Sequence, residues 1–291
     1  MGEVRTAPDT SPTAHSSDPY DGGVACALIT GATSGIGAEF AAQLAARGDD
    51  LVLVARNEER LTETARELTE RHGVTVEVLP ADLNDRSRTL RVADRLAATD
   101  RPIDLLVNNA GFGVHSRLLD PDLMEETDRA VEVMLSSVIL LSGAAARAMT
   151  ERGSGHIVNV SSTAGFITQG TYSAIKAAVT TFTESLSVEL DGTGVTTTVL
   201  CPGWVRTEFH DRAELGVSKI PPWAWVPVDQ LVSECLADVD RGKVISIPMT
   251  RWAIAIQLAR IAPRRVIHTL SGRIRSGRRS HDRRRTAEPE G

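Results

Sequence analysis

Tyr172 and Lys176 are the two residues whose types and spacing best suit proton transfer. They are four positions apart on a segment with a helical pattern, so their side chains share one helix face. A free tyrosine has a pKa of about 10, which is too high for efficient proton exchange at neutral pH. A nearby ammonium favours the phenolate, so we expect Lys176 to lower the pKa of Tyr172. The other tyrosine, Tyr20, lies in a stretch without apolar periodicity, which leaves Tyr172 as the candidate acid/base.

A glycine-rich turn follows the first predicted strand and runs straight into a helical segment. A bound dinucleotide needs such a turn, because its pyrophosphate must approach the backbone closely and meet the free N–H groups of a helix N-terminus. An isolated glycine-rich turn is weak evidence for a dinucleotide site, but a turn that lies between a strand and a helix is much stronger evidence. The spacing is Gly-x-x-x-Gly-x-Gly rather than Gly-x-Gly-x-x-Gly. The residues that we expect to bind the dinucleotide here are Thr30, Gly31, Ser34, Gly35, Ile36 and Gly37.

The tip of the second predicted strand bears on the choice of dinucleotide. A carboxylate at this position would bind the adenosine ribose hydroxyls and repel a 2′-phosphate, but Ala55 occupies the tip and Arg56 follows. A guanidinium forms forked, charge-assisted hydrogen bonds with a phosphate dianion. The sequence therefore favours NADP(H) over NAD(H), with the alternative that Arg56 merely begins a polar loop.

The elements that must position these residues alternate along the chain. Short Val/Leu/Ile-rich runs, apolar on both pleat faces, are typical of strands covered on both sides. Alternating strands and helices with right-handed crossovers predict an α/β fold, a Rossmann-like doubly wound parallel sheet of about seven strands with helices on both faces. The expected strands are Ala25–Thr30, Leu51–Ala55, Thr75–Pro80, Leu105–Asn108, His156–Ser161, Thr196–Cys201 and Lys243–Ile247. The expected helices are Gly37–Arg47, Arg60–His72, Asp85–Ala97, Asp122–Thr150, Ser173–Leu190 and Val228–Asp238.

Length and composition fit one large domain with two tails. The chain has 291 residues, 42% hydrophobic and 24% charged, as in ordinary globular proteins. We expect a disordered arm at residues 1–22, a catalytic domain at 23–250, a basic amphipathic helical extension at 251–275 and a disordered tail at 276–291. The net charge of −6 gives no global basic excess that would suggest nucleic acid.

Other chemistries find little support in the residue pattern. The seven histidines and three cysteines follow no metal-ligand spacing, so we expect no metal. No Gly-x-Ser-x-Gly elbow marks a hydrolase. Without a signal peptide or a long apolar run, the expected compartment is the cytoplasm.

Taken together, the motifs resemble those of the short-chain dehydrogenase/reductase family, in its NADP(H)-preferring bacterial-type branch. The resemblance covers residues from about 24 to 250, and its specificity comes from the order and spacing of short strings. After the glycine turn come Asp82-Leu83, Asn108-Asn109-Ala110-Gly111, Asn159-Val160-Ser161-Ser162, Tyr172-Ser-Ala-Ile-Lys176 and Pro202-Gly203-Trp-Val-Arg-Thr207.

The resemblance implies a role for each matching residue. Tyr172 would be the catalytic acid/base, Lys176 would also hold the nicotinamide ribose, and Ser162 would orient the substrate carbonyl. Val205 and Thr207 would hold the nicotinamide carboxamide. Asp82 and Leu83 would lie near the adenine, with Asn108 to Gly111 along the cofactor. The cofactor contacts expected besides the turn are Arg56, Asn57, Asp82, Leu83, Asn109, Ala110, Gly111, Tyr172, Lys176, Pro202, Gly203, Val205 and Thr207.

Two positions depart from the family pattern. Ser162 precedes Tyr172 by ten residues, which makes the connecting loop about three residues short, and Ser161 becomes a substitute candidate for Ser162. Met134 occupies the place where the family usually has an asparagine that supports a water chain from the lysine to solvent. A thioether cannot replace an amide in a proton relay, so the relay would need rerouting through Ser136 or Ser137, unless the helix is misaligned by one turn.

The substrate side and the C-terminal extension leave alternatives open. Trp204, Phe209, Trp223 and Trp225 fall within one segment that could cover an apolar substrate or simply anchor a loop. The extension after Arg251 could be an interfacial helix at a membrane surface, a lid over an apolar substrate, or a helix packed on the domain or on a second subunit. The nine arginines from Arg264 to Arg285 could belong to a solvated tail or could contact a membrane surface or a partner.

Two function hypotheses follow. The first is an NADP(H)-dependent oxidoreductase that interconverts an apolar ketone or aldehyde and its alcohol, working on a small-molecule substrate as a homo-oligomer. The second is a catalytically weak NADP(H)-binding sensor or scaffold with the same fold, which the short loop and Met134 would favour. Turnover of carbonyl compounds with NADPH separates the two.

Overall fold

The strands of the protein form one seven-stranded parallel sheet. The computed structural model describes residues 25–114, 124–205, 224–263 and 265. The strand order is β3-β2-β1-β4-β5-β6-β9, so the chain reverses direction across the sheet between β1 and β4. This confirms the Rossmann-like doubly wound sheet expected from the sequence. The strands are β1 (Cys26–Thr30), β2 (Asp50–Ala55), β3 (Val76–Pro80), β4 (Leu105–Asn108), β5 (Gly155–Val160), β6 (Val195–Leu200) and β9 (Ile245–Ser246).

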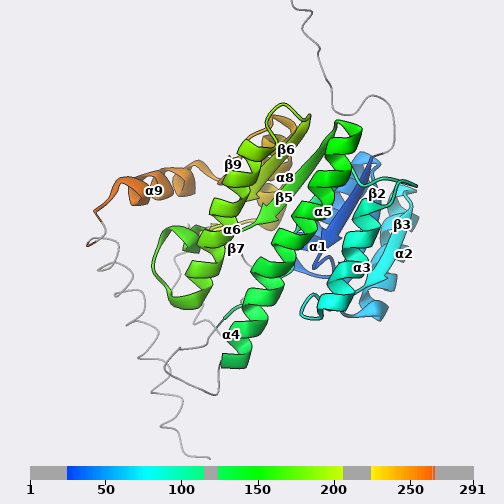
Figure 1. Ribbon diagram of the computed structural model, residues 1–291, viewed down its shortest axis with the longest axis horizontal. Helices are drawn as coiled ribbons and strands as arrows, with labels where there is room; N and C mark the ends of the chain where they lie inside the picture. The colour runs from blue at the N-terminus through cyan, green and yellow to red at the C-terminus, as the bar shows by residue number, and fades with distance from the viewer. Residues whose placement is uncertain (1–24, 115–123, 206–223, 264, 266–291) are drawn as a thin grey trace, which may run out of the picture.

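Helices cover both faces of the sheet, as Figure 1 shows. Along β1, Cys26 and Leu28 join a core cluster on one face, whereas Ala27 and Ile29 join the cluster on the other. The strand must therefore be apolar at every position. The first face carries α3 (Arg86–Ala97), α4 (Met124–Val131), α5 (Ser137–Arg152) and α6 (Gly170–Glu189). The second carries α1 (Gly35–Arg47), α2 (Glu58–His72) and α8 (Val228–Asp240).

The long helix predicted over Asp122–Thr150 is interrupted. A π-helical segment, η2 (Glu132–Ser136), separates α4 from α5. Taken as one helix, residues 124–152 have the length and mean hydropathy of a membrane span, but 56% of the most apolar stretch is buried inside the protein. It is a core helix, and its apolar character follows from packing on the sheet.

Buried amides link β4 and β5 at the middle of the sheet. Asn108 and Asn159 face each other in the strand register, and Asn108 Nδ2 donates to Asn159 Oδ1 at 2.9 Å. Ser142 of α5 donates to the same oxygen, and Asn159 Nδ2 donates to Thr183 of α6 at 3.0 Å. Each amide is almost fully buried, so these hydrogen bonds avoid the cost of unpaired polar groups in the core.

A few short elements complete the described chain. The 3-10 segment η3 (Thr163–Phe166) leads to α6, and a two-stranded parallel sheet joins β7 (Trp204–Val205) to β8 (Trp225–Val226). Helix α9 (Thr250–Ile261) overlaps the first part of the segment predicted as an extension at 251–275, of which residues 264 and 266–275 lie outside the described residues. The arm predicted at 1–22 and the tail predicted at 276–291 lie outside the described residues.

Candidate functional site

The turn after β1 forms a cradle of bare backbone. Gly31 and Gly35 have positive φ values of 67° and 56°, a region that favours glycine. Gly37 lies so close to its neighbours that a Cβ there would be 2.3 Å from the carbonyl oxygen of Gly31. Helix α1 begins after Ser34, whose side chain makes no capping hydrogen bond, and its first turn has no acidic residue. Uncapped N–H groups and positive helix dipole fit a pyrophosphate, so the residues present suit a dinucleotide.

Thr30 ties this turn to the end of β4. Its hydroxyl accepts hydrogen bonds from the backbone N–H groups of Asn109 and Ala110, at 2.9 and 3.0 Å. The Asn109 amide in turn donates to the carbonyls of Thr30 and Gly31. Four of the predicted cofactor residues, Thr30, Gly31, Asn109 and Ala110, are therefore joined by hydrogen bonds in which Thr30 and Asn109 hold the turn.

The residues expected around the adenosine end are placed at the tips of β2 and β3. Arg56 is exposed and makes no ion pair with any residue of the described chain, so its guanidinium is free to meet a phosphate. Asn57 is engaged differently, because its Oδ1 accepts from the N–H of Arg60 and caps α2. Asp82 is half-buried and accepts from the N–H of Asn84, and Leu83 is buried.

Ser162, Tyr172 and Lys176 come together at the carboxyl end of β5. The hydroxyl groups of Ser162 and Tyr172 share a hydrogen bond. The Lys176 ammonium donates to the carbonyl of Val160 at 2.9 Å and lies 5.8 Å from the centre of the Tyr172 ring. The structure thus gathers the three residues that the sequence singled out, and adds the Val160 carbonyl, which no side-chain motif could have indicated.

Burial governs the pKa values of this pair. Although the tyrosine side chain as a whole is only partly buried, loss of water raises the pKa of Tyr172 to about 12, and the hydrogen bond from Ser162 opposes this only in part. Burial also lowers the pKa of Lys176 to about 8. The ammonium of Lys176 is held at the Val160 carbonyl and lies over the Tyr172 ring, and the expectation that it lowers the pKa of Tyr172 when the cofactor is bound stays a prediction.

The short loop before Tyr172 is accommodated by an early helix start. Helix α6 begins at Gly170, not at Ser173 as predicted, so Tyr172 lies in its first turn and still reaches Ser162. Ser161 points elsewhere, because its buried hydroxyl donates to the backbone carbonyl of Lys176 at 2.7 Å and contacts Thr180. Of the two candidate serines, Ser162 is the one beside Tyr172.

Met134 lies in the π-helical segment and is almost completely buried in a core cluster. Its sulfur would be 3.1 Å from a Cβ placed on Gly111, so it packs under the predicted cofactor loop. The hydroxyl of Ser137 donates to the carbonyl of Val133, and Ser136 is half-buried. The Ser137 hydroxyl is thus already engaged, which leaves Ser136 as the alternative relay residue.

Residues after β6 form the remaining wall of the site. Pro202 and Val205 are buried, and the rings of Trp204 and Trp225 meet edge to face across the small β7–β8 sheet, with centroids 6.5 Å apart. Gly203 is covered by the Trp252 ring of α9, a contact that sequence reasoning missed. Thr207, Phe209 and Trp223 lie outside the described residues.

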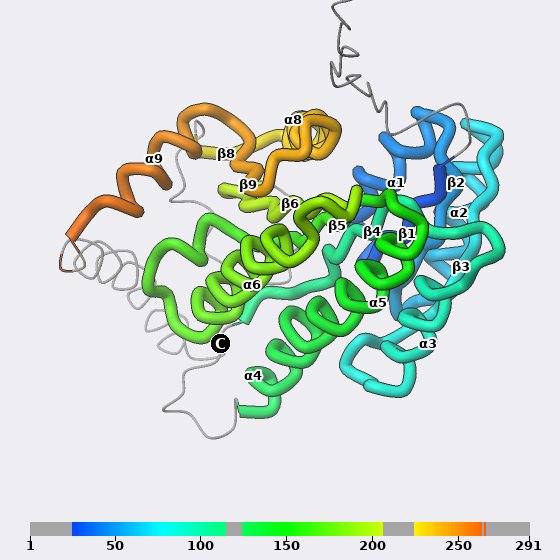
Figure 2. Tube along the Cα trace, turned by 45° about the horizontal axis from the view of Figure 1, so that its top comes forward, coloured from blue at the N-terminus to red at the C-terminus, as the bar shows by residue number. Residues whose placement is uncertain are grey.

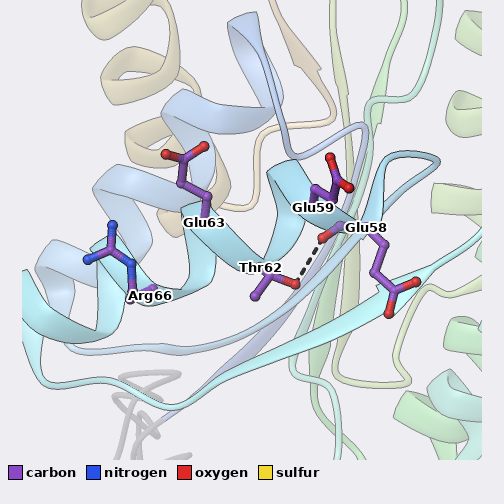
Figure 3. A pocket seen from close by; sticks show the side chains of 5 residues that line it. All are labelled: Glu58, Glu59, Thr62, Glu63 and Arg66. Atoms are coloured by element: carbon purple, nitrogen blue, oxygen red, sulfur yellow. Dashed lines mark hydrogen bonds between the residues drawn. The ribbon is translucent and has the colours of Figure 1, made fainter.

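A separate hollow lies on the outer face of α2 (Figure 3). Its carboxylates would repel a phosphate, and α2 packs beside β2 and β3 rather than near Tyr172. It therefore does not belong to the site. The residues that line it, all exposed, are Glu58, Glu59, Thr62, Glu63 and Arg66.

Comparisons with known proteins place the fold and motifs in context. The family model described as short chain dehydrogenase matches residues 25–216. An uncharacterized oxidoreductase of Staphylococcus saprophyticus is 34% identical over 196 residues, covering 66% of this chain and 83% of its own. An uncharacterized oxidoreductase of Mycobacterium tuberculosis is 32% identical over 232 residues, covering 70% of this chain and 91% of its own.

Two solved structures are also similar. A short-chain dehydrogenase from Sphingobium yanoikuyae in complex with NADPH has a TM-score of 0.74 and 35% identity, covering 81% of this chain and 94% of its own. The bulky-bulky ketone specific alcohol dehydrogenase from Comamonas testosteroni has a TM-score of 0.70 and 31% identity, covering 81% and 92%.

Proposed function

This chain belongs to the short chain dehydrogenase family of oxidoreductases, and we propose that it interconverts an apolar ketone or aldehyde and the corresponding alcohol with NADP(H). The observation that carries the proposal is the meeting of Ser162, Tyr172 and Lys176 at the carboxyl end of β5. This end of a doubly wound sheet is where ligands of such folds bind.

In the proposed reduction, bound NADPH supplies the hydride that the substrate carbon accepts. Ser162 donates a hydrogen bond to the carbonyl oxygen and fixes its direction. The Tyr172 hydroxyl gives its proton to that oxygen as negative charge develops, which yields the alcohol and a tyrosinate. Lys176, whose ammonium lies 5.8 Å from the centre of the Tyr172 ring, would stabilise that tyrosinate and contact the nicotinamide ribose.

The preference for NADP(H) over NAD(H) rests on Arg56. Strand β2 ends at Ala55, so no carboxylate stands there to repel a phosphate. Arg56 follows, and its exposed guanidinium suits the 2′-phosphate of NADP(H). The similar Sphingobium yanoikuyae protein, solved with NADPH, supports the same choice. The remaining cofactor contacts are proposed at the glycine turn, at Asp82–Leu83, at Asn109–Gly111 and at Pro202–Thr207.

An apolar substrate is favoured by the surroundings of the site. Trp204 and Trp225 stand at the small β7–β8 sheet next to the end of β6, and the similar Comamonas testosteroni enzyme is specific for bulky ketones. We further propose that the protein works as a homo-oligomer, as expected from the family to which it belongs. A cytoplasmic location is proposed on the three free, buried cysteines.

The competing function, a weakly active NADP(H)-binding sensor or scaffold, is favoured by one observation. Burial raises the pKa of Tyr172 to about 12, which opposes formation of the tyrosinate. A screen of apolar ketones and aldehydes with NADPH, followed by its absorbance, distinguishes the two, because the sensor binds the cofactor without consuming it.

The decisive variant for the enzyme is Tyr172→Phe. It removes only the transferable proton, so turnover should fall by about three orders of magnitude or more. The dissociation constant for NADPH should change little, as measured by fluorescence titration. Full turnover in this variant would refute the mechanism, and an equal loss of cofactor binding would assign Tyr172 a structural role.

A further inference from the structure

Helix α9 gathers exposed apolar side chains on one face. Ile254, Leu258 and Ile261 follow the spacing i, i+4, i+7, which places them on one stripe. Their exposed fractions are 55%, 59% and 80%. Other large apolar side chains that are exposed in the described residues occur singly, one on each of four helices. These are Leu90 on α3, Met124 on α4, Ile139 on α5 and Val188 on α6.

The opposite face of α9 is occupied by contacts with the domain. Ile256 is buried in a small cluster with Val199, Cys201 and Ile247. One turn earlier, Trp252 covers Gly203 and donates its indole N–H to the carbonyl of Ala224 at 3.2 Å. At 3.6 residues per turn, Trp252 and Ile256 lie about half a turn from the stripe. Because one face is anchored, the stripe must point away from the domain, where Figure 2 shows α9 extending from the body.

The charge of the chain changes sign at this helix. Residues 1–250 contain 21 lysines and arginines against 35 acidic residues, a net charge of −14. Residues 251–291 contain eleven arginines against three acidic residues, a net charge of +8. Nine of these arginines lie between Arg264 and Arg285, directly after the stripe. The apolar stripe therefore adjoins a strongly cationic segment carried by an acidic domain.

We propose that α9 and the arginine-rich chain after it dock this protein on the surface of an anionic lipid bilayer. The stripe would enter the boundary between headgroups and acyl chains, and the arginines would pair with lipid phosphates. Neither signal alone gives stable attachment, but an apolar face combined with a basic cluster does. A second copy fits the stripe less well, because two stripes brought together would also bring two cationic segments together.

Flotation of the full chain with lipid vesicles tests the proposal. We expect binding to vesicles that contain phosphatidylglycerol, weaker binding at high salt, and little binding to vesicles of phosphatidylcholine alone. The triple variant Ile254→Ser, Leu258→Ser, Ile261→Ser should reduce the ratio of bound to free protein about tenfold or more. A matched control, Leu90→Ser, Ile139→Ser, Val188→Ser, removes three exposed apolar side chains that lie on other helices and should bind like the parent.

A second variant probes the charge independently of the stripe. Arg264→Glu with Arg265→Glu should weaken binding to the phosphatidylglycerol vesicles without altering the thermal unfolding of the domain. Undiminished vesicle binding by the stripe variant would overturn the proposal, as would an equal loss in the matched control. A change of oligomeric mass in the stripe variant with vesicle binding intact would assign the stripe to a second copy instead. Turnover is not a readout here, so the outcome is independent of the proposed reaction.

Discussion

The two halves of the candidate site are held in place by different kinds of interaction. The cofactor half, Thr30–Gly37 with Asn109–Gly111, depends on backbone: positive φ values, missing side chains and N–H groups collected by one threonine hydroxyl. The catalytic half, Ser161, Ser162, Tyr172 and Lys176, depends on buried and half-buried side chains that hydrogen-bond to carbonyls and hydroxyls. We therefore expect the cofactor half to be disrupted by an added side-chain atom at a glycine, and the catalytic half to be disrupted by loss of a hydrogen-bonding side chain.

The largest effect is expected from an added methyl group in the cofactor half. In Gly37→Ala the new Cβ would lie 2.3 Å from the Gly31 carbonyl oxygen and 2.4 Å from Asn109 Nδ2. Because backbone cannot yield cheaply, we expect a loss of about 4 kcal/mol or more in the free energy of unfolding, measured with urea. NADPH binding should fall with it.

Gly143→Ala is the matched control for this change. Gly143 also lies within a helix, α5, but its Cβ would meet only the end of the Arg147 side chain, at 3.5 Å. Alanine favours helix over glycine by about 1 kcal/mol, so this variant should be neutral or more stable. If both variants lose the same stability, the cradle is not the cause.

Met134 packs against Gly111 of the cofactor half and belongs to the core cluster on which Tyr172 of the catalytic half packs. Met134→Asn places an amide in an apolar cluster, under Gly111. We expect a loss of about 3–5 kcal/mol in the free energy of unfolding, since apolar packing is lost and the amide lacks partners. Met134→Leu should cost less than about 1.5 kcal/mol. A stable asparagine variant with faster turnover would instead show that proton supply limits the rate.

Arg56, at the tip of β2, is an exposed side chain predicted to contact the same cofactor from outside the glycine turn. In Arg56→Asp a charge-assisted pair with the 2′-phosphate becomes repulsive, so NADPH should lose about 2–4 kcal/mol of binding relative to NADH. Arg56→Gln, which removes the charge without repulsion, should lose less. Both are measured as ratios of dissociation constants, and equal constants for the two cofactors in the parent would contradict the assignment.

The smallest effect separates the two serines of the catalytic half. Ser161→Ala removes the hydrogen bonds of its hydroxyl to the Lys176 carbonyl and to Thr180 and should cost about 1–2 kcal/mol of stability without lowering turnover. Ser162→Ala removes the acceptor for the N–H of Ala164 and should cost about 1 kcal/mol, but it should also lower turnover, because its hydroxyl faces Tyr172. The reverse pattern, with turnover lost only in the Ser161 variant, would exchange their roles.

The sequence predicts the cofactor half more completely than the hydrogen bonds of the catalytic half. Strand β4, Leu105–Asn108, was predicted residue for residue, and the glycine turn was located, because backbone demands leave a strict residue pattern. The binding of Lys176 to Val160 and of Ser161 to the Lys176 carbonyl was not predicted. Carbonyl partners carry no signature in side-chain types, so they emerge only from packing.

Contacts between distant residues were also missed in the C-terminal part of the chain. The sequence predicted a helix after Arg251, but not that Trp252 covers Gly203, since that contact joins residues about fifty positions apart. The π-helical segment at Glu132–Ser136 was read as continuous helix, because its apolar spacing differs from helical spacing by a single residue. Both features depend on tertiary contacts rather than local pattern.

The paired amides of Asn108 and Asn159 have a consequence for how the molecule opens. A slip of one residue between β4 and β5 would place the two amides on opposite faces of the sheet and break the hydrogen bond between them. Separating β4 from β5 would also disturb the hydrogen bonds that tie these amides to Ser142 of α5 and Thr183 of α6. In native-state hydrogen exchange, the amide protons of β4 and β5 should exchange only through global unfolding.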